Sequence, residues 1–139
     1  MHLVQIPPDA LSKAEMWALI CPILERGVER SHNTETVEGN LRAIMAKQKQ
    51  LWVAISDEKK IIAAAVTMLH QYQTGLKEAV ILVLGGEDGT LSEILDLRGE
   101  LEGWAKVEGC GRVRILARKA WVRHLPDYKL AAYVMSKEL

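Results

Sequence analysis

The chain has 139 residues, of which 49% are hydrophobic and 26% are charged. This length and composition indicate one folded domain, over residues 1–139, and argue against disorder. The 18 Lys and Arg residues balance the 18 Asp and Glu residues, so the chain has no net positive field to draw it to nucleic acid or to an anionic membrane. MHLVQIPPDA at the N-terminus lacks the features of a signal peptide, and no apolar run reaches the length of a membrane span. We therefore expect a protein that is made in a cytosol and is not secreted by a signal peptide.

The first part of the chain predicts a strand and then two helices. HLVQI, residues 2–6, alternates in polarity and stops at two prolines, as a short strand does. From residue 10 to residue 28 apolar side chains recur at helical spacing, and Pro22 inside this helix is expected to bend or break it. A second helix is predicted over residues 37–47.

The middle of the chain predicts a hairpin, a buried strand and a long helix. QLWVAIS and IIAAAVTML flank the polar turn DEKK, which indicates a β-hairpin over residues 50–69. EAVILVL, residues 78–84, is an almost uninterrupted apolar run, typical of a strand buried on both faces at the centre of a sheet. A helix is predicted over residues 91–108. Gly99 and Gly103 weaken it, and they make sense if its backbone lies close against the sheet.

The C-terminal part predicts a strand, a short helix and a last strand. RVRILA covers residues 112–117, KAWVRHL covers residues 119–125, and LAAYVMSKEL covers residues 130–139. The complete order is β-α-α-β-β-β-α-β-α-β. It indicates one α/β domain with a mixed central sheet and helices on both faces.

This order, with a strand, loop and helix at its centre, resembles the GNAT family of N-acetyltransferases over nearly the whole chain. Several segments are similar to small GNAT-like proteins encoded by tailed bacteriophages: MWALICPILERGVERS, QLWVAISD, LEGWAKVEGCGRVRILARKAWVRHL and VMSKEL. In those proteins a helix ends in W-A-x-x-x-G-C, the next strand ends in Arg, and a Trp follows. The matching residues here are Trp104, Ala105, Gly109, Cys110, Arg118 and Trp121. The resemblance implies a GNAT-like fold and a phage origin.

The resemblance also implies where acetyl-CoA would bind. In catalytic GNAT proteins the pyrophosphate lies on backbone N–H groups between the central strand and the next helix, at a Q/R-x-x-G-x-G/A signature. Glycines let the backbone approach phosphates, and the start of a helix offers unpaired N–H groups. The corresponding LGGEDGTLSE supplies Gly85, Gly86 and Gly89, but neither the leading Gln or Arg nor the spacing. These three glycines are candidate cofactor-binding residues if the loop is a divergent phosphate loop.

Two features favour a capped turn that binds no phosphate. Glu87 and Asp88 place negative charge where a pyrophosphate would lie. Thr90 and Glu93 have the spacing of a capping box, which would satisfy the free N–H groups of the helix from within the chain. We therefore expect a degenerate acetyl-CoA site and no cofactor.

The catalytic residues of the family are only weakly matched. A Tyr in the short last helix often acts as general acid in GNAT enzymes, and here alignment places Leu125 at that position. A shift of one residue gives His124, which can donate a proton, whereas Tyr128 falls on neither position. The candidates for a general base are Glu78 and His70. Glu78 also reads as a solvent-exposed strand end beside Lys77, and His70 as a polar residue at the entry to a loop.

No metal site is predicted. Cys21 and Cys110 lie far apart and form no C-x-x-C or Cys/His pattern, and His2 and His32 are isolated.

Three functions remain open from the sequence. The first is a non-catalytic structural or accessory phage protein, associated with the virion or with its morphogenesis, that contacts other phage proteins or copies of itself. The second is an active acetyl-CoA-dependent N-acetyltransferase. The third and weakest is a nucleic-acid-binding accessory. Its candidate basic patch is Arg112, Arg114, Arg118, Lys119 and Arg123. No membrane partner is expected.

Overall fold

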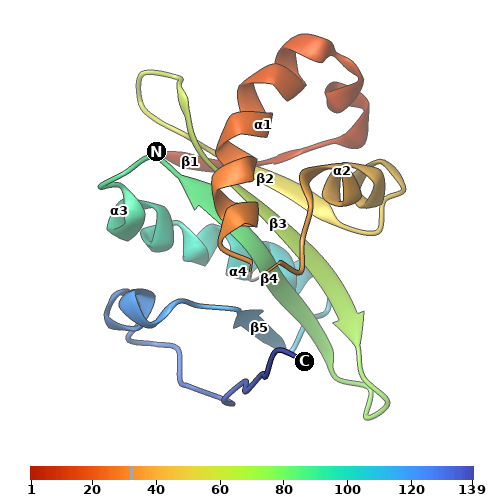
Figure 1. Ribbon diagram of the computed structural model, residues 1–139, viewed down its shortest axis with the longest axis vertical. Helices are drawn as coiled ribbons and strands as arrows, with labels where there is room; N and C mark the ends of the chain where they lie inside the picture. The colour runs from red at the N-terminus through yellow and green to blue at the C-terminus, as the bar shows by residue number, and fades with distance from the viewer. Residues whose placement is uncertain (32) are drawn as a thin grey trace.

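A five-stranded mixed sheet forms the centre of the molecule in the computed structural model, which describes residues 1–31 and 33–139. The spatial order of the strands follows the chain, β1-β2-β3-β4-β5. The strands are β1 (His2–Ile6), β2 (Gln50–Ile55), β3 (Ile61–Gln71), β4 (Lys77–Gly86) and β5 (Arg112–Ile115). Neighbouring strands are antiparallel from β1 to β4, and β4 and β5 are parallel (Figure 1). The predicted hairpin and mixed sheet are confirmed.

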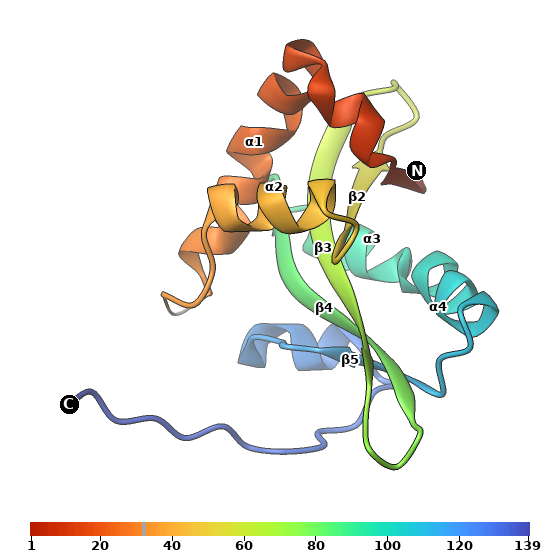
Figure 2. The same cartoon turned by 90° about the vertical axis from the view of Figure 1, so that its right-hand side faces the viewer.

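Helices cover both faces of this sheet, as the sequence predicts (Figures 1 and 2). Helices α1 (Ala14–Glu29) and α2 (Val37–Met45) lie on one face, and α3 (Leu91–Asp96) and α4 (Arg98–Val107) lie on the other. Two 3₁₀ helices, η1 (Pro8–Ser12) and η2 (Lys119–His124), complete the regular structure of the described residues. Across residues 1–31 and 33–139, no helix combines the length and apolar character that crossing a bilayer requires.

Helix α1 contains a proline but is not interrupted by it. It continues through Pro22 to Glu29, so the break expected at this position does not occur. Its Ile20 and Leu24 are fully buried in one core cluster with side chains of β2, β3 and β4. This packing offsets the backbone hydrogen bond that proline cannot donate, because helices in proteins are stabilised mainly by their apolar face.

Two glycines bring α1 and β4 into direct backbone contact. A Cβ atom on Gly85 would overlap the carbonyl oxygen of Ile23, and one on Gly27 would lie 2.7 Å from Cγ1 of Val83. Because there is no room for a side chain at either position, α1 rests closer to the sheet here than any other residue pair would allow.

The long helix predicted over residues 91–108 is two helices. The chain breaks at Leu97, where Nη1 of Arg98 donates to the carbonyl oxygen of Leu95 at 3.0 Å. That oxygen would accept from the amide of residue 99 in a continuous helix. A Cβ on Gly99 or Gly103 would meet no atom within 4 Å, so the expectation that these glycines lie close on the sheet is wrong.

A bulge in β4 separates its two halves. Val83 pairs with Val66 and Ile81 with Thr67, which leaves Leu82 as an extra residue. Strand β5 pairs with β4 only up to Ile81, so the carboxyl ends of the two strands diverge beyond it. The side chains that pack together beside this divergence, here called the wedge cluster, are Leu84, Leu95, Ile115, Trp121 and Leu125.

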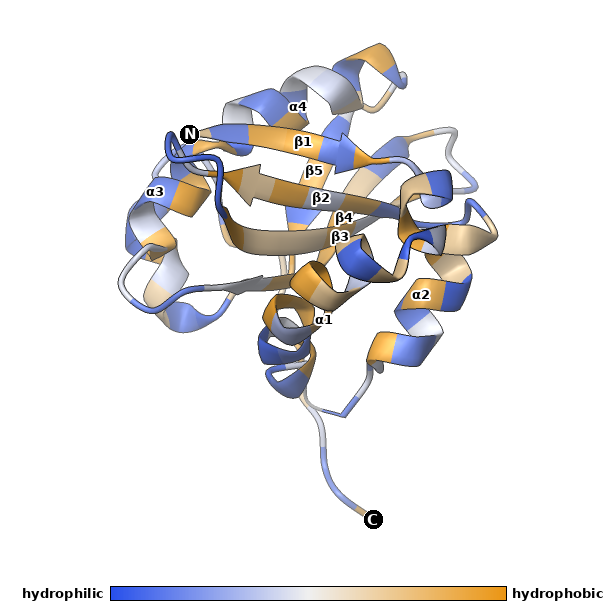
Figure 3. Ribbon diagram, turned by 90° about the horizontal axis from the view of Figure 1, so that it is seen from above, coloured by the Kyte–Doolittle hydropathy of each residue, from blue (hydrophilic) through white to orange (hydrophobic). Residues whose placement is uncertain are grey.

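The predicted last strand is wrong. Residues 125–139 form no strand, and the chain after Tyr128 extends away from the body (Figures 2 and 3). Residues 130–139 have the pattern of a strand, but a strand needs a neighbour to accept its backbone hydrogen bonds. The exposed apolar residues of this segment are Leu130, Tyr133, Val134, Met135 and Leu139.

Substituting two glycines tests the contact between α1 and β4. We expect Gly85→Ala to lower the free energy of unfolding by about 3 kcal/mol, because the added methyl group overlaps the α1 backbone. Gly103→Ala, in the open on α4, is the matched control and should raise it by about 1 kcal/mol. Urea unfolding measures both. Equal effects of the two substitutions would contradict the contact.

Candidate functional site

Glu78 is the buried carboxylate of the sheet. It lies in β4 and has no exposed surface, so its interpretation as a solvent-exposed strand end is wrong. Its Oε1 accepts a hydrogen bond from the Tyr72 hydroxyl at 2.8 Å and lies 3.1 Å from Nε of Arg114. Its Oε2 accepts from Nε of Arg112. Two guanidinium groups and a phenol therefore surround one carboxylate.

The register of the parallel strands brings these groups together. Glu78 lies opposite Arg112, and Val80 lies opposite Arg114. Since alternate residues of a strand share a face, both arginines project on the face that carries Glu78. Tyr72 comes from the turn between β3 and β4, where its backbone amide donates to the carbonyl oxygen of Leu76 at 2.8 Å.

The surroundings of Glu78 stabilise the ionised form of its carboxyl group. Burial raises the pKa of Glu78, but hydrogen bonds from Tyr72 and Arg112 and the positive charge of Arg114 outweigh it, so the net pKa lies below the usual value. The carboxylate is ionised at neutral pH, and both of its oxygens are engaged. A general base needs an oxygen free to take a proton. His70, the other candidate base, is exposed in β3, and its ring packs edge-on against Tyr72 with centroids 4.4 Å apart.

The candidate base and the candidate phosphate loop lie at opposite ends of β4. Gly86 lies eight positions after Glu78, which corresponds to roughly 25 Å along a strand. The structure therefore brings Glu78 together with Tyr72 and the arginines, and not with the glycines.

The three candidate glycines have three different surroundings. Gly85 lies beneath α1, as described above. A Cβ on Gly86 would lie 2.7 Å from Cδ1 of Ile94 in α3. Gly89 has a φ of 78° in the turn before α3, and a Cβ there would meet no atom within 4 Å. Of the three, Gly89 alone faces open space.

The predicted capping box is wrong. Thr90 is the N-cap residue of α3, but its hydroxyl donates to the carbonyl oxygen of Glu87 at 2.6 Å and caps no amide of the helix. The Glu87 carboxylate in turn lies 3.1 Å from the ammonium of Lys60. This turn is therefore less unfavourable for an anion than the sequence predicts. The first amides of α3 lack a side-chain cap, and the Glu87 carboxylate has the Lys60 ammonium beside it.

The candidate general acid His124 and the nearby Tyr128 both make hydrogen bonds to other side chains of the protein. Nε of Arg123 donates to Nε2 of His124 at 3.3 Å, which uses that ring nitrogen as an acceptor. Leu125 is buried in the wedge cluster. The Tyr128 hydroxyl donates to Glu102 at 2.8 Å, and burial together with this hydrogen bond raises the pKa of Tyr128 far above its ordinary value.

The space beside the wedge cluster is small. A cavity of about 50 Å³ lies there, and its lining includes Ile81, Leu84, Leu95, Leu101 and Ile115. Pockets that hold small molecules usually measure about 300–1,000 Å³. Another pocket, of about 240 Å³, lies between η1, α2 and the start of β2 and is lined in part by Lys47, Lys49 and Gln50.

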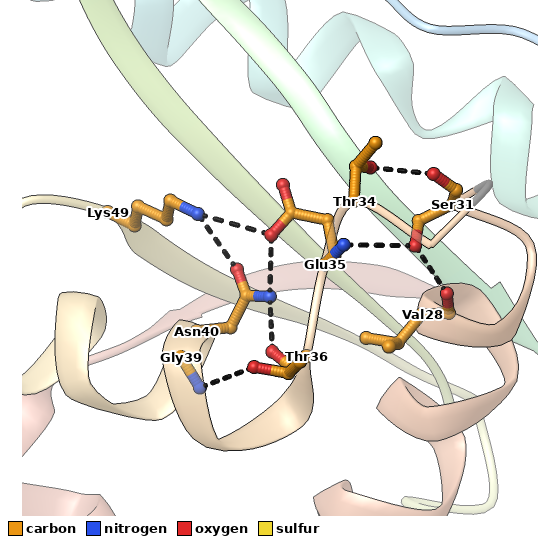
Figure 4. Close-up of polar contacts among 8 residues, drawn as sticks. All are labelled: Val28, Ser31, Thr34, Glu35, Thr36, Gly39, Asn40 and Lys49. Carbon is orange, nitrogen blue, oxygen red and sulfur yellow. Dashed lines mark hydrogen bonds and ion pairs between the residues drawn. The ribbon is translucent and has the colours of Figure 1, made fainter. Parts of the chain in front are cut away.

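A buried polar network that the sequence did not reveal joins the α1–α2 connection and the start of α2 to Lys49, the residue before β2 (Figure 4). Asn40 has no exposed surface, and its Nδ2 donates to Glu35 at 3.0 Å and to the carbonyl oxygen of Thr36 at 2.8 Å. Lys49 completes it by donating to Asn40 at 3.2 Å. Every buried side-chain polar atom in the described part of the chain has a hydrogen-bond partner, those of this network included. His32, in the same connection, lies outside the described residues.

In the ranges 1–31 and 33–139, no group of three His, Cys, Asp or Glu side chains could hold a metal ion.

Trp121 packs η2 against the sheet. Trp52 donates to Thr67 and packs edge-on against Trp104, with ring centroids 5.0 Å apart. The arginines of the basic patch at β5 are partly neutralised, because Arg112 and Arg114 both pair with Glu78.

Replacing Glu78 tests its structural role. We expect Glu78→Gln to lower the free energy of unfolding at pH 7 by about 2–3 kcal/mol, because two half-exposed guanidinium groups lose their counter-charge. The folded-state pKa of Glu78 is lowered, so its contribution is complete above the unfolded pKa of about 4.3 and is lost as pH falls below it.

The difference between wild type and Glu78→Gln should therefore shrink as the pH falls from 7 to 3 in urea unfolding experiments. Glu58→Gln, in the exposed turn between β2 and β3, is the control and should change stability little at either pH. A difference between wild type and Glu78→Gln that does not vary with pH would contradict the ionised pair.

No family model and no curated protein sequence matches the chain. Solved structures match over its whole length. An aminoglycoside acetyltransferase from an uncultured soil metagenomic sample is 12% identical, with a TM-score of 0.70 over 99% of this chain and 95% of that one. A ribosomal-protein-alanine N-acetyltransferase from Brucella melitensis biovar Abortus 2308 is 11% identical, with a TM-score of 0.65 over 100% and 99%. Glucosamine-6-phosphate N-acetyltransferase from Arabidopsis thaliana is 11% identical, with a TM-score of 0.65 over 98% and 96%. At these identities the likeness concerns the fold alone, and the chain has a GNAT-like acetyltransferase fold.

Proposed function

We propose that this GNAT-fold protein has a degenerate acetyl-CoA site and acts as a non-catalytic structural or accessory protein through protein–protein contacts. One observation carries the proposal: Trp121 and Leu125 pack against Leu84 of β4 and Ile115 of β5, and the cavity beside this wedge cluster measures only about 50 Å³. Ligands of open α/β sheets bind at the carboxyl ends of strands, where neighbouring connections part. We infer that the wedge cluster closes that place in this chain.

The glycine loop gives acetyl-CoA little support. A phosphate cradle needs backbone that a ligand can reach, and Gly85 faces the carbonyl oxygen of Ile23. Gly86 faces the end of the Ile94 side chain. The residues present therefore do not fit the cofactor, and no catalytic step is assigned to it.

The candidate catalytic groups do not converge. Glu78 lies roughly 25 Å from Gly86 along β4, and it is neutralised by Arg112 and Arg114. His124 accepts a hydrogen bond from its neighbour Arg123. A base and an acid must both reach the reacting atoms within hydrogen-bond distance, and these two residues come from opposite ends of β4 and β5.

The setting that we propose is a tailed phage, on the strength of the sequence segments that resemble phage GNAT-like proteins. The protein would be made in the host cytoplasm and would contact other virion subunits or copies of itself. Mass spectrometry of purified particles tests this setting. Peptides of the chain at stoichiometric abundance support it, and their absence from both particles and assembly intermediates would contradict it.

One observation favours the alternative of an active acetyl-CoA-dependent N-acetyltransferase. The first amides of α3 lack a side-chain cap, since the Thr90 hydroxyl donates to Glu87 instead. Under this alternative, Gly85, Gly86 and Gly89 would line the phosphates and His124 would act as the acid.

Titration calorimetry with acetyl-CoA separates the two functions. We expect no saturable heat up to millimolar cofactor, and none from an E87Q/D88N double variant, because removing the loop charges leaves the wedge cluster in place. An authentic acetyltransferase run under the same conditions is the positive control. Micromolar binding to the wild-type protein would overturn the non-catalytic proposal.

A further inference from the structure

The larger of the two pockets described above lies between η1, α2 and the start of β2 and measures about 240 Å³. At about 30 Å³ per water molecule in the liquid, this volume corresponds to roughly eight waters. Two lysines line it, Lys47 and Lys49, and no Asp or Glu of the described residues does. The apolar part of its lining is Ile6, Pro8, Ile44 and Leu51. Ammonium groups beside apolar side chains suit a small molecule with one anionic group and an apolar part.

Lys47 has a backbone conformation that favours glycine. Its φ is 61°, two residues after the end of α2. The amide of Gln48 donates to the carbonyl oxygen of Ala43 at 2.8 Å, and the amide of Lys47 donates to that of Ile44 at 3.0 Å. This pair of bonds forms a Schellman motif. The position of Lys47 in that motif is usually glycine, because a Cβ atom is strained there.

Helix α4 ends in the same motif with the expected glycine. The amide of Cys110 donates to the carbonyl oxygen of Ala105 at 2.9 Å, and the amide of Gly109 donates to that of Lys106 at 3.0 Å. Gly109 has a φ of 84°. The chain therefore keeps a lysine after α2 where it uses glycine after α4. A side chain kept in a strained position that the fold does not require indicates a function for that side chain.

Neither an ion pair nor the end of α2 accounts for Lys47. None of the ion pairs of the described residues includes it. The carbonyl oxygens of Arg42, Ala43 and Ile44 at the end of α2 already accept backbone amides, which leaves little for a lysine side chain to satisfy. The remaining surroundings of Lys47 are those of the pocket.

Lys49 is held in place beside the same pocket (Figure 4). Its Nζ donates to Oδ1 of Asn40 at 3.2 Å and to Oε2 of Glu35 at 3.5 Å, and its side chain is only 17% exposed. An ammonium group has three donors, so one is left for a ligand. Because this donor is positioned before a ligand arrives, less side-chain freedom is lost on binding.

We propose that this pocket binds a small organic anion, with the charged group at Lys47 and Lys49 and the apolar part against Ile44 and Leu51. Glu35 offsets the charge of Lys49, so one unpaired positive charge, that of Lys47, remains for a single anionic group. The pocket lies beside β1 and β2, away from the wedge cluster. The inference therefore goes beyond the proposed protein contacts and does not depend on whether acetyl-CoA binds.

An amide NMR titration of the full chain with butyrate and with butyl phosphate tests the proposal. We expect saturable shifts at the amides of residues 44–51, with a millimolar dissociation constant because the ligand has few atoms. Binding of butyrate alone would identify a carboxylate site, and binding of butyl phosphate alone would identify a phosphate site. Butylammonium has the same apolar part and the opposite charge, and it should cause no saturable shift.

Two glycine substitutions separate the role of the Lys47 side chain from that of its backbone. Lys47→Gly should weaken binding roughly tenfold or more, because a charged contact is lost. The same variant should keep or raise the urea midpoint of unfolding, because glycine suits its φ. Lys59→Gly is the matched control. Lys59 has a φ of 63° in the turn between β2 and β3, outside the pocket lining, so this variant should keep or raise the midpoint and leave the affinity unchanged.

Three results of the titrations would overturn the proposal: no saturable shift with either anion, equal binding of butylammonium, or an unchanged affinity in Lys47→Gly. A urea midpoint that falls in Lys47→Gly but not in Lys59→Gly would assign Lys47 to the fold and would overturn the proposal as well.

Discussion

The contact of the Ile23 carbonyl oxygen with Gly85 fixes how α1 lies on the sheet, and much of the molecule depends on it. It brings Ile20 and Leu24 over β3 and β4, where they form the larger core cluster. The same contact covers the end of β4 at Gly85 with the backbone of α1. Gly85 lies against the backbone of α1 and serves the packing of the core, which supports the proposal that it holds no phosphate.

At the other end of β4, ion pairs hold β5 to the sheet. Strand β5 has four residues, too few to bury much apolar surface, and Arg112 and Arg114 anchor it by pairing with Glu78 across the parallel register. A buried carboxylate with two partners is costly to separate, because either side left alone keeps a desolvated charge. The strand is thus firmly attached through its inner edge, and its outer edge remains available.

The sequence predicted what depends on neighbours along the chain and missed what depends on distant ones. Hydrophobic periodicity located the strands and the two helices α1 and α2, because burial of one face is a local pattern. Glu78 looked solvent-exposed beside Lys77, since its guanidinium partners come more than thirty residues later. The Thr90 capping box failed because a nearer acceptor, the Glu87 carbonyl oxygen, took its hydroxyl proton. Residues 130–139 had the pattern of a strand, but no sequence pattern says which edge it will meet.

The uncapped amides of α3 favour binding of an anion, whereas the packed wedge cluster opposes binding of acetyl-CoA. The free energies of the two effects can be compared. A helix N-terminus stabilises an anion by about 0.3–1 kcal/mol near the surface. We infer that a ligand reaching from this loop to His124 would displace Trp121 and Leu125, which pack against Leu84 and Ile115. Exposing a buried leucine costs about 1.5–3 kcal/mol, and a tryptophan that buries about 150–250 Å² costs more. The loss exceeds the gain several-fold, so the packing of η2 against the sheet supports our proposal of a degenerate acetyl-CoA site more strongly than the missing Gln or Arg and the altered glycine spacing do.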